Sequence, residues 1–417
     1  MRVLFLTLYF PPEAGPPQSR SYETARRLID WGHEVTVLTA FPNHPTGVIA
    51  KGYRGKLLMR ENMDGIDVLR TWLYPAPNRG LWRWAAKHLS FAGSSLLMSP
   101  LAGKADVVVV GSASLFLALS AYGISRVQGI PWVMTVADLW PATAVAQGRL
   151  SNPGLIKLAE HLESFVYNHA DTVVAVTQAM CDRVIQTGVP RERVAHIPNG
   201  TDTELFRPAA DGVDTRRALT LDGKFVVMYA GSMGPAHGLD AVLEAAKLLS
   251  DEKDVQFVLV GDGSAKKDLM KKASREGIES VSFLGLQPQA QMPAVLNAAD
   301  VVVVTQRKSE FFGGVVPFKT AEAMACGRPI VMASIGEAAA MLERAGAGLV
   351  VEPECPQGLA EAIRKVKEQP ELAAEMGKAG RAFAVENLDR TKLARRTEEV
   401  LLRLVEANRR GARASAL

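Results

Sequence analysis

The chain is poor in cysteine and has no concentrated block of basic residues. Its 417 residues include only three cysteines, Cys181, Cys326 and Cys355, which are too far apart for the close spacing of a metal site. This pattern predicts reduced thiols in a cytosolic protein rather than a disulfide framework. The net charge is only +4, and the lysines and arginines are scattered, which argues against a nucleic-acid partner. A mild basic excess is compatible with anionic substrates or an anionic membrane surface.

The sequence also lacks a signal peptide and a convincing membrane span. The apolar start at 1–6 is followed by Pro11-Pro12-Glu13 rather than by a small-residue cleavage site. Residues 107–125 carry no charge, but Gly111-Ser112 divides them, which favours a buried strand followed by a buried helix. We therefore expect a cytoplasmic protein, with peripheral attachment to the inner face of the cell membrane as a further hypothesis.

Apolar strands and helical patterns alternate through most of the chain. Strands are expected at 2–7, 34–39, 68–71, 107–110, 132–136 and 172–177, and again, after turn residues at 197–202, at 225–230, 256–260, 281–284, 301–305, 329–333 and 348–351. Continuously apolar, β-branched strands are typical of parallel sheets covered on both faces. The sequence therefore predicts an α/β fold with two Rossmann-like, doubly wound parallel sheets facing a cleft. We expect domains at 1–200 and 201–385, and a helical tail at 386–417 that docks back on the first domain.

A glycine loop leads into a short helix between residues 313 and 327. Four residues bring backbone N–H groups close to a ligand at this point: Gly313, Gly314, Val315 and Val316. Lys319 lies in the first helical turn, where the macrodipole disfavours a cation, which indicates an anionic partner such as a phosphate. Glu322 lies one turn further on, where its carboxylate can accept two hydrogen bonds from a ribose diol. A helix with a solvated lysine and glutamate remains the alternative.

Other candidate residues follow the predicted strands, where ligands bind in doubly wound sheets. A glycine-rich turn between a strand and a helix can hold a pyrophosphate, but the turn from Gly231 to Gly238 contains Ser232 and His237 and no lysine or arginine, so taken alone it favours an ordinary tight turn. Gly261 begins a second glycine turn, which also reads as a helix start. Asp138 follows the strand at 132–136, and its carboxylate is either a base that orients an acceptor hydroxyl or a cap of the next helix.

An aromatic and basic patch precedes the apolar residues 89–101. Its members are Trp72, Tyr74, Arg79, Trp82, Arg83, Trp84, Lys87 and His88. Tryptophan rings with basic side chains are typical of the interface of an anionic membrane. A surface loop followed by a core helix is the alternative.

Several short motifs, in their order and spacing, resemble the retaining, nucleotide-sugar-dependent glycosyltransferases of family four, which have the two-domain GT-B fold. These motifs are Tyr9-Phe10-Pro11-Pro12-Glu13, residues 32–39, Ile197-Pro198-Asn199-Gly200-Thr201-Asp202, Leu259-Val260-Gly261-Asp262-Gly263 and residues 322–329. A closer resemblance, to bacterial N-acetyl-L-fucosaminyltransferase-like enzymes of O-antigen and capsule assembly, rests on residues 42–47, 52–55, 138–141 and 316–319. The resemblance covers nearly the whole chain.

The resemblance implies an acceptor-binding first domain and a donor-binding second domain. The residues expected on the donor side are Gly15, Gly231, Ser232, His237, Gly261, Gly313, Gly314, Val315, Val316, Lys319 and Glu322, with Asp138 and Lys319 as catalytic candidates. The family usually has an arginine and a lysine where Ser232 and His237 stand. It also has a glutamate eight residues before its ribose-binding glutamate, where this chain has Gly314. Glu310 lies twelve before Glu322 and is the remaining candidate for a contact with the donor sugar.

The resemblance further implies retaining transfer of a hexosyl or N-acetylhexosaminyl group from a nucleotide-sugar, with UDP as the family's usual nucleotide. The acceptor is expected to be lipid-linked or a saccharide, in the synthesis of bacterial surface polysaccharide. No Asp-x-Asp metal motif lies in the right place, so neither a metal nor another cofactor is expected. Three alternatives remain open: a glycosyltransferase for a soluble small molecule, a non-catalytic sugar-nucleotide binder, and a GT-B epimerase.

Overall fold

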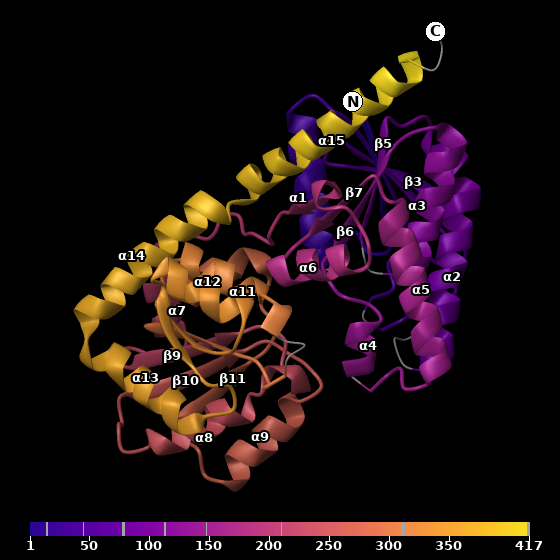
Figure 1. The fold of residues 1–417 in the computed structure, drawn as a ribbon. Helices are drawn as coiled ribbons and strands as arrows, with labels where there is room; N and C mark the ends of the chain where they lie inside the picture. Colours follow the sequence, from indigo (N-terminus) through magenta and orange to yellow (C-terminus); the bar gives the residue numbers. More distant parts are fainter. Residues whose placement is uncertain are drawn as a thin grey trace. The chain divides into compact units, whose positions relative to one another are not determined.

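The computed structural model describes residues 1–13, 16–44, 46–76, 80–111, 114–146, 148–209, 211–309 and 313–414. The chain forms two compact units (Figure 1). The first unit consists of Met1–Pro198 together with Thr391–Leu417, and the second consists of Asn199–Arg390. Each unit is a parallel sheet with helices on both faces, so the predicted doubly wound α/β architecture is confirmed.

The sheet of the first unit has eight strands in the described part of the chain. They are β1 (Arg2–Thr7), β2 (Glu34–Ala40), β3 (Leu58–Met63), β4 (Ile66–Thr71), β5 (Val107–Gly111), β6 (Trp132–Val136), β7 (Thr172–Ala175) and β8 (Val194–His196). Their order is β3-β4-β2-β1-β5-β6-β7-β8, and all pairs are parallel except β3 with β4. The chain reverses direction across the sheet between β1 and β5, where doubly wound sheets bind ligands at the carboxyl ends of their strands.

Strand β3 was not predicted from the sequence. It is a polar edge strand that pairs antiparallel with β4 through a tight hairpin. Asp64 and Gly65 at the turn both have positive φ, 52° and 86°, as a type I′ hairpin requires. The Asp-Gly pair was the available signal, but the strand before it lacks a buried face and shows no apolar run.

Helices cover both faces of the first sheet. They are α1 (Pro16–Asp30), α2 (Leu81–Met98), α3 (Leu115–Gln128), α4 (Ala142–Ala146), α5 (Pro153–His169), α6 (Gln178–Gln186) and α15 (Arg390–Ala414), with 3-10 turns at Ser99–Ala102 and Arg191–Arg193. Side chains of α2, α3 and α5 meet the strands in one core, and α1 and α15 complete the core on the opposite face. Within the uncharged stretch, residues 107–111 form β5 and residues 115–125 lie in the largely buried α3, as predicted. None of the described helices has the length and apolarity to cross a membrane.

Helix α2 divides the predicted aromatic and basic patch into exposed and buried parts. Trp82 is 78% exposed, whereas Lys87 and His88 are only 1% and 3% exposed. Residues three or four apart share a helix face, so Lys87 and His88 lie on the face that packs against the rest of the unit. The prediction that they belong to a surface patch was wrong, and Arg79 lies outside the described residues.

The second unit has a six-stranded sheet in the order β11-β10-β9-β12-β13-β14, with every pair parallel. The strands are β9 (Phe225–Ala230), β10 (Val255–Val260), β11 (Val281–Leu284), β12 (Val301–Thr305), β13 (Ile330–Ala333) and β14 (Gly348–Val351). The helices are α7 (Gly212–Ala218), α8 (Asp240–Leu248), α9 (Lys266–Arg275), α10 (Met292–Asn297), α11 (Phe318–Ala325), α12 (Glu337–Ala345), α13 (Pro356–Glu368) and α14 (Pro370–Asn387), with 3-10 turns at Pro235–His237 and Gln289–Gln291. Successive strands are added on one side of β9 and then on the other, so the strand order reverses between β9 and β12. The carboxyl ends of these two strands are therefore the expected ligand site.

Helix α15 belongs to the first unit although it follows the second in the sequence. Its Leu401 and Val405 are buried in the core that α1 also covers. The ring nitrogen Nε2 of His33 lies 2.6 Å from a carboxylate oxygen of Glu398, and the Arg395 guanidinium lies 3.4 Å from the centre of the Trp31 ring. The helix before it, α14, continues to Asn387, so the tail begins slightly later than the expected residue 386.

Candidate functional site

Two glycine loops lie against each other where β9 and β10 end. Gly231 follows β9 and Gly261 follows β10, and both have positive φ, 144° and 134°. A Cβ atom on Gly261 would lie 2.0 Å from the carbonyl oxygen of Gly231, and one on Gly263 would lie 2.5 Å from that of Met233. Only glycine permits this close approach, which sets the position of the loop after β9.

Lys319 joins this loop from the start of α11. Pro317 is the N-cap of that helix, one position earlier than the first-turn place expected for it, and Lys319 is the second helical residue. Its Nζ lies 3.8 Å from the centre of the Tyr229 ring, at the end of β9. A Cβ atom on Gly231 would lie 2.9 Å from the same Nζ. The structure thus brings together the two segments that the sequence singled out separately.

The Lys319 ammonium group is enclosed by protein. Its Nζ is buried and has no hydrogen-bond partner among the residues that the structure describes. Burial lowers the pKa of Lys319 to about 7, although the nearby charge of Glu322 acts in the opposite direction. A buried cation without an acceptor costs free energy, which an anionic ligand would recover.

His237 provides a second buried nitrogen beside the same loop. It ends the 3-10 turn Pro235–His237, and its carbonyl oxygen accepts a hydrogen bond of 2.6 Å from the Thr305 hydroxyl. Its Nδ1 is buried without a partner in the described part of the chain. Burial, and then the charge of Lys319, lower the pKa of His237 to about 4, so the ring is neutral at pH 7. A neutral imidazole can donate one hydrogen bond to an anion without adding charge.

Glu322 lies one turn beyond Lys319 and is half-buried. Burial raises the pKa of its carboxyl group, while the charge of Arg390, a hydrogen bond with Gln289 and the charge of Lys319 act against that rise. Neither Arg390 nor Gln289 carried a signal in the sequence. Glu322 follows Lys319 by three residues, so both side chains lie on the same side of α11.

The remaining donor-side candidates have less distinctive surroundings. The backbone of Gly313 packs on Gly336, where an added Cβ would lie 2.2 Å from the Gly313 carbonyl oxygen. The Ser232 carbonyl oxygen accepts a hydrogen bond of 2.5 Å from the Tyr229 hydroxyl. The three other residues before α11, Gly314, Val315 and Val316, are half-buried. Gly15 and Glu310 lie outside the described residues.

Asp138 lies in the first unit, directly after β6. The Thr143 hydroxyl in α4 donates a hydrogen bond to its carboxylate, whereas a side chain that caps a helix accepts from a backbone N–H of the first turn. Asp138 is exposed, yet enough protein surrounds the carboxyl group to raise its pKa, against the hydrogen bonds from Thr143 and Leu139.

The sequence analysis missed a second polar cluster at the carboxyl ends of β1 and β2. One carboxylate oxygen of Glu13 accepts hydrogen bonds of 2.7 Å from the backbone N–H groups of both Asn43 and His44. Lys87 donates to the Tyr9 hydroxyl at 3.3 Å, and burial lowers the pKa of this lysine to about 8. A hollow of about 290 Å³ opens beside Glu13 and His44. Glu13 was noted only as part of a motif, and no spacing connected it with residue 87.

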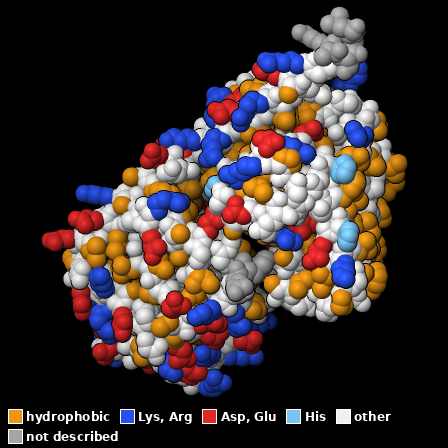
Figure 2. Space-filling model, viewed as in Figure 1, with side chains coloured by type: hydrophobic (Ala, Val, Ile, Leu, Met, Phe, Trp, Pro, Cys, Tyr) orange, Lys and Arg blue, Asp and Glu red, His pale blue; other side chains and the backbone are white. Residues whose placement is uncertain are grey.

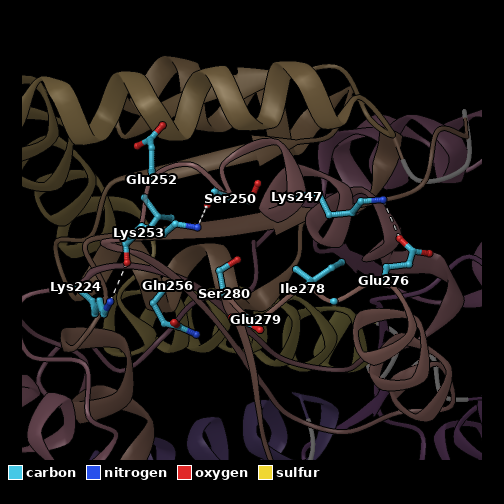
Figure 3. A pocket seen from close by; sticks show the side chains of 12 residues that line it. Lys224, Lys247, Ser250, Glu252, Lys253, Gln256, Glu276, Ile278, Glu279 and Ser280 are labelled. Atoms are coloured by element: carbon cyan, nitrogen blue, oxygen red, sulfur yellow. Dashed lines mark hydrogen bonds and ion pairs between the residues drawn. The ribbon is translucent and has the colours of Figure 1, made fainter.

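A larger hollow, of about 440 Å³, lies on the second unit at the opposite ends of its strands (Figure 3). Its lysines are bound to their neighbours: Lys247 lies 3.0 Å from a Glu276 oxygen, Lys224 donates to the Lys253 carbonyl at 2.9 Å, and Lys253 donates to the Ser250 carbonyl at 2.9 Å. Because these lysines already have partners, they do not need an anionic ligand as the buried Lys319 nitrogen does. Among the described residues, no three His, Cys, Asp or Glu side chains are grouped to hold a metal ion.

Comparison with known families assigns a type to each half of the chain. Residues 17–200 match the family described as Glycosyl transferase 4-like domain, and residues 214–383 match Glycosyl transferases group 1. The two matches fall in the first and second structural units respectively.

Relatives and solved structures agree with these matches. The chain is 29% identical over 408 residues to the putative colanic acid biosynthesis glycosyl transferase WcaI of Escherichia coli, covering 95% of this chain and 98% of the relative. It is 31% identical to a D-inositol 3-phosphate glycosyltransferase of Segniliparus rotundus, covering 61% of this chain and 57% of the relative. The fold is similar to that of Anabaena Alr3699/HepE, whose crystal structure contains UDP, with 22% identity, a TM-score of 0.73 and coverage of 97% and 100% of the two chains. It is also similar to that of WaaG, a glycosyltransferase involved in lipopolysaccharide biosynthesis, with 17% identity, a TM-score of 0.71 and coverage of 95% and 99%.

Proposed function

We propose that this chain, whose two halves match a glycosyl transferase 4-like domain and a group 1 domain, is a GT-B glycosyltransferase whose donor is a nucleotide-sugar bound by the second unit. The observation that carries this proposal is the enclosed ammonium of Lys319, which lies against Gly231 without a hydrogen-bond acceptor among the described residues. A diphosphate supplies the negative charge and the acceptor oxygens that this nitrogen lacks.

In this proposal each residue of the site has a defined contact with the donor. Lys319 and His237 bind the diphosphate, together with the backbone N–H groups of residues 313–316 and of the Gly231 loop. Glu322 accepts hydrogen bonds from the two ribose hydroxyls. UDP is the preferred nucleotide because the structural relative HepE was crystallised with it.

The transfer proposed is retaining. The bond between the sugar and the diphosphate breaks through an oxocarbenium-like state, and negative charge grows on the leaving diphosphate. Lys319 stabilises that charge, so it acts more strongly in the transition state than in the bound donor. Asp138 orients the acceptor hydroxyl from the first unit, and Glu310 is the candidate contact for the donor sugar, because Gly314 stands where the family has its first glutamate.

The acceptor proposed is a lipid-linked or saccharide intermediate of bacterial surface polysaccharide, at the cytoplasmic face of the membrane. Support comes from the similarity to WcaI, a putative colanic acid biosynthesis glycosyl transferase. The relative that glycosylates D-inositol 3-phosphate favours a second candidate, transfer to a soluble small molecule, but it matches a smaller share of the chain.

A panel of UDP-, GDP- and dTDP-sugars tests the proposal by thermal shift. A donor at one hundred times its dissociation constant adds about 2.7 kcal/mol to the free energy of unfolding. Lys319→Met, which keeps the length of the side chain without its charge, is the control and is expected to lose most of the shift. Release of free nucleoside diphosphate with an acceptor separates an enzyme from a passive binder, and NMR of the new glycosidic bond tests retention. A chain that no nucleotide-sugar stabilises contradicts the proposal.

A further inference from the structure

We infer that the outward face of helix α2 lies on an anionic lipid bilayer and holds the enzyme at the surface that carries its acceptor. This inference deepens the proposed function, because a lipid-linked acceptor is reached only from the bilayer. It differs from the sequence-based patch in the residues involved, since Lys87 and His88 are buried and the surface continues along the helix beyond them.

The outward face of α2 is apolar along its whole length. Its exposed apolar side chains recur at helical spacing into the following 3-10 turn, and they are defined here as the α2 stripe: Trp82, Leu89, Leu96, Leu97 and Leu101, exposed by 78%, 50%, 39%, 76% and 50%. Ala86, Gly93 and Pro100 fill the positions between them and are exposed as well. The opposite face, with Phe91 and Ala92, is buried in the core. A helix that packs on a core normally presents polar residues to water, which α2 does not.

Neighbouring elements extend the α2 stripe instead of covering it. The backbone N–H of Tyr74 donates a hydrogen bond of 2.8 Å to Ser90, and Ser94 donates to the Trp72 carbonyl, so this segment runs along α2. Both aromatic side chains are exposed there, Trp72 by 38% and Tyr74 by 44%. In Figure 2, hydrophobic side chains gather along the edge of the first unit at the position of α2 in Figure 1. Exposed tryptophan and tyrosine rings beside leucines are typical of side chains at a membrane interface.

The charges along the α2 stripe indicate the kind of bilayer. Residues 81–105 contain no aspartate or glutamate, and the exposed charged residues of this segment are Arg83 near one end and Lys104 near the other. Two cations flanking an apolar face complement the anionic headgroups of a bilayer, whereas a second copy of the same face would bring equal charges together. We therefore assign the surface to an anionic membrane rather than to a dimer.

The orientation of α2 connects this surface with the acceptor. At the start of the helix, Trp84 stacks on Trp140 with ring centres 5.2 Å apart, and Trp140 belongs to the segment that follows β6. The α2 stripe therefore begins beside the carboxyl ends of the first sheet and extends away from them. Headgroups of a bilayer bound at the start of the stripe would therefore lie near the edge of the sheet where Asp138 is found.

Flotation with vesicles of phosphatidylcholine and phosphatidylglycerol, and of phosphatidylcholine alone, tests the inference on the full chain. We expect the protein to float with the anionic vesicles and to float less with the neutral ones. The double variant Leu89→Glu/Leu97→Glu is expected to weaken the partitioning about tenfold or more, because burial of two leucine side chains is lost. The matched control is Leu248→Glu/Leu286→Glu, at leucines of the second unit that are 45% and 76% exposed. Leu89→Phe/Leu97→Phe is expected to keep binding, because it keeps the face apolar.

Three outcomes would overturn the inference: a wild-type protein that stays at the bottom with both vesicles, a glutamate variant that floats like the wild type, or a wild-type dimer that the glutamate variant separates into monomers. The thermal shift with UDP-sugars, measured on the same samples, reports on the proposed function independently. If the shift remains and flotation fails, the membrane inference falls alone. If the shift is absent from the wild type, the donor proposal fails whatever the vesicles show.

Discussion

Donor binding is expected to take up a proton at Lys319. In the free protein, burial lowers the pKa of this lysine to about 7, so about half of the molecules lack the charge at neutral pH. A bound diphosphate favours the ammonium form and moves the pKa back toward its ordinary value, which lies well above 9. Binding is therefore strongest below pH 7 and weakens as the pH rises, because a proton must be supplied.

The size of the effect follows from the pKa of the free lysine. With a pKa of about 7, roughly three-quarters of the molecules carry the ammonium at pH 6.5 and about 3% carry it at pH 8.5. The dissociation constant should then increase about twenty-fivefold between these values. Above pH 7 the loss of binding free energy should approach about 1.4 kcal/mol per pH unit. His237 has a pKa of about 4 and stays neutral through this range, so it contributes no proton.

Isothermal titration calorimetry with a UDP-sugar tests this prediction. Measurements in two buffers with different enthalpies of ionisation should show an uptake of roughly three-quarters of a proton per donor at pH 7.5. The diphosphate of a nucleotide-sugar has no group that ionises near pH 7, so the ligand adds no proton of its own. Lys319→Met keeps Glu322 and His237 and should bind weakly with little dependence on pH. A wild-type affinity that is constant from pH 6.5 to 8.5 would refute the reasoning.

Further predictions concern the site and the two cores. Glu322→Ala should cost about 2–4 kcal/mol of nucleotide binding if the carboxylate accepts two hydrogen bonds, and unchanged affinity by calorimetry would exclude that role. Gly261→Ala should lower the free energy of unfolding by at least about 1–3 kcal/mol, since its Cβ would meet the Gly231 carbonyl, whereas Gly285→Ala, with open space around it, should be nearly neutral in urea denaturation. Leu401→Ala should destabilise the first unit by about 2–5 kcal/mol, because the side chain is fully buried, while its neighbour Leu402, 37% exposed, should tolerate the same change; similar melting curves for both would contradict the docking of α15.

The parallel strands could be predicted because both of their faces are buried. Val107–Gly111 and Val301–Thr305 are nearly continuous β-branched runs, and burial on two sides leaves no polar face to interrupt them. Strand β3 could not be found in this way, because one face of this edge strand is exposed and the other is only half-buried, so it shows no apolar run. The face of α2 that packs against the core could not be predicted either. The helix is apolar on both its buried and its outward face, and periodicity alone does not distinguish them.

The candidate site was predictable where backbone chemistry determines it. Glycines at the ends of β9 and β10 and a lysine at the start of α11 mark the carboxyl end of the sheet, and the structure brings Gly231 and Lys319 into contact. The partners that tune these groups were not predictable. Tyr229 beneath the ammonium and Gln289 beside Glu322 depend on which way strand and loop side chains point, which long-range packing decides.

The return of the chain to the first unit has a consequence for its synthesis. The first core is completed by Leu401 and Val405, which leave the ribosome about 200 residues after Pro198. At roughly 5–20 residues per second, the surface that α15 covers would stay open for about 10–40 s, while the second unit, one uninterrupted segment, can fold first. The nascent first domain is therefore a natural client for chaperones. A truncation after residue 390 should leave a soluble second domain attached to an aggregation-prone first one.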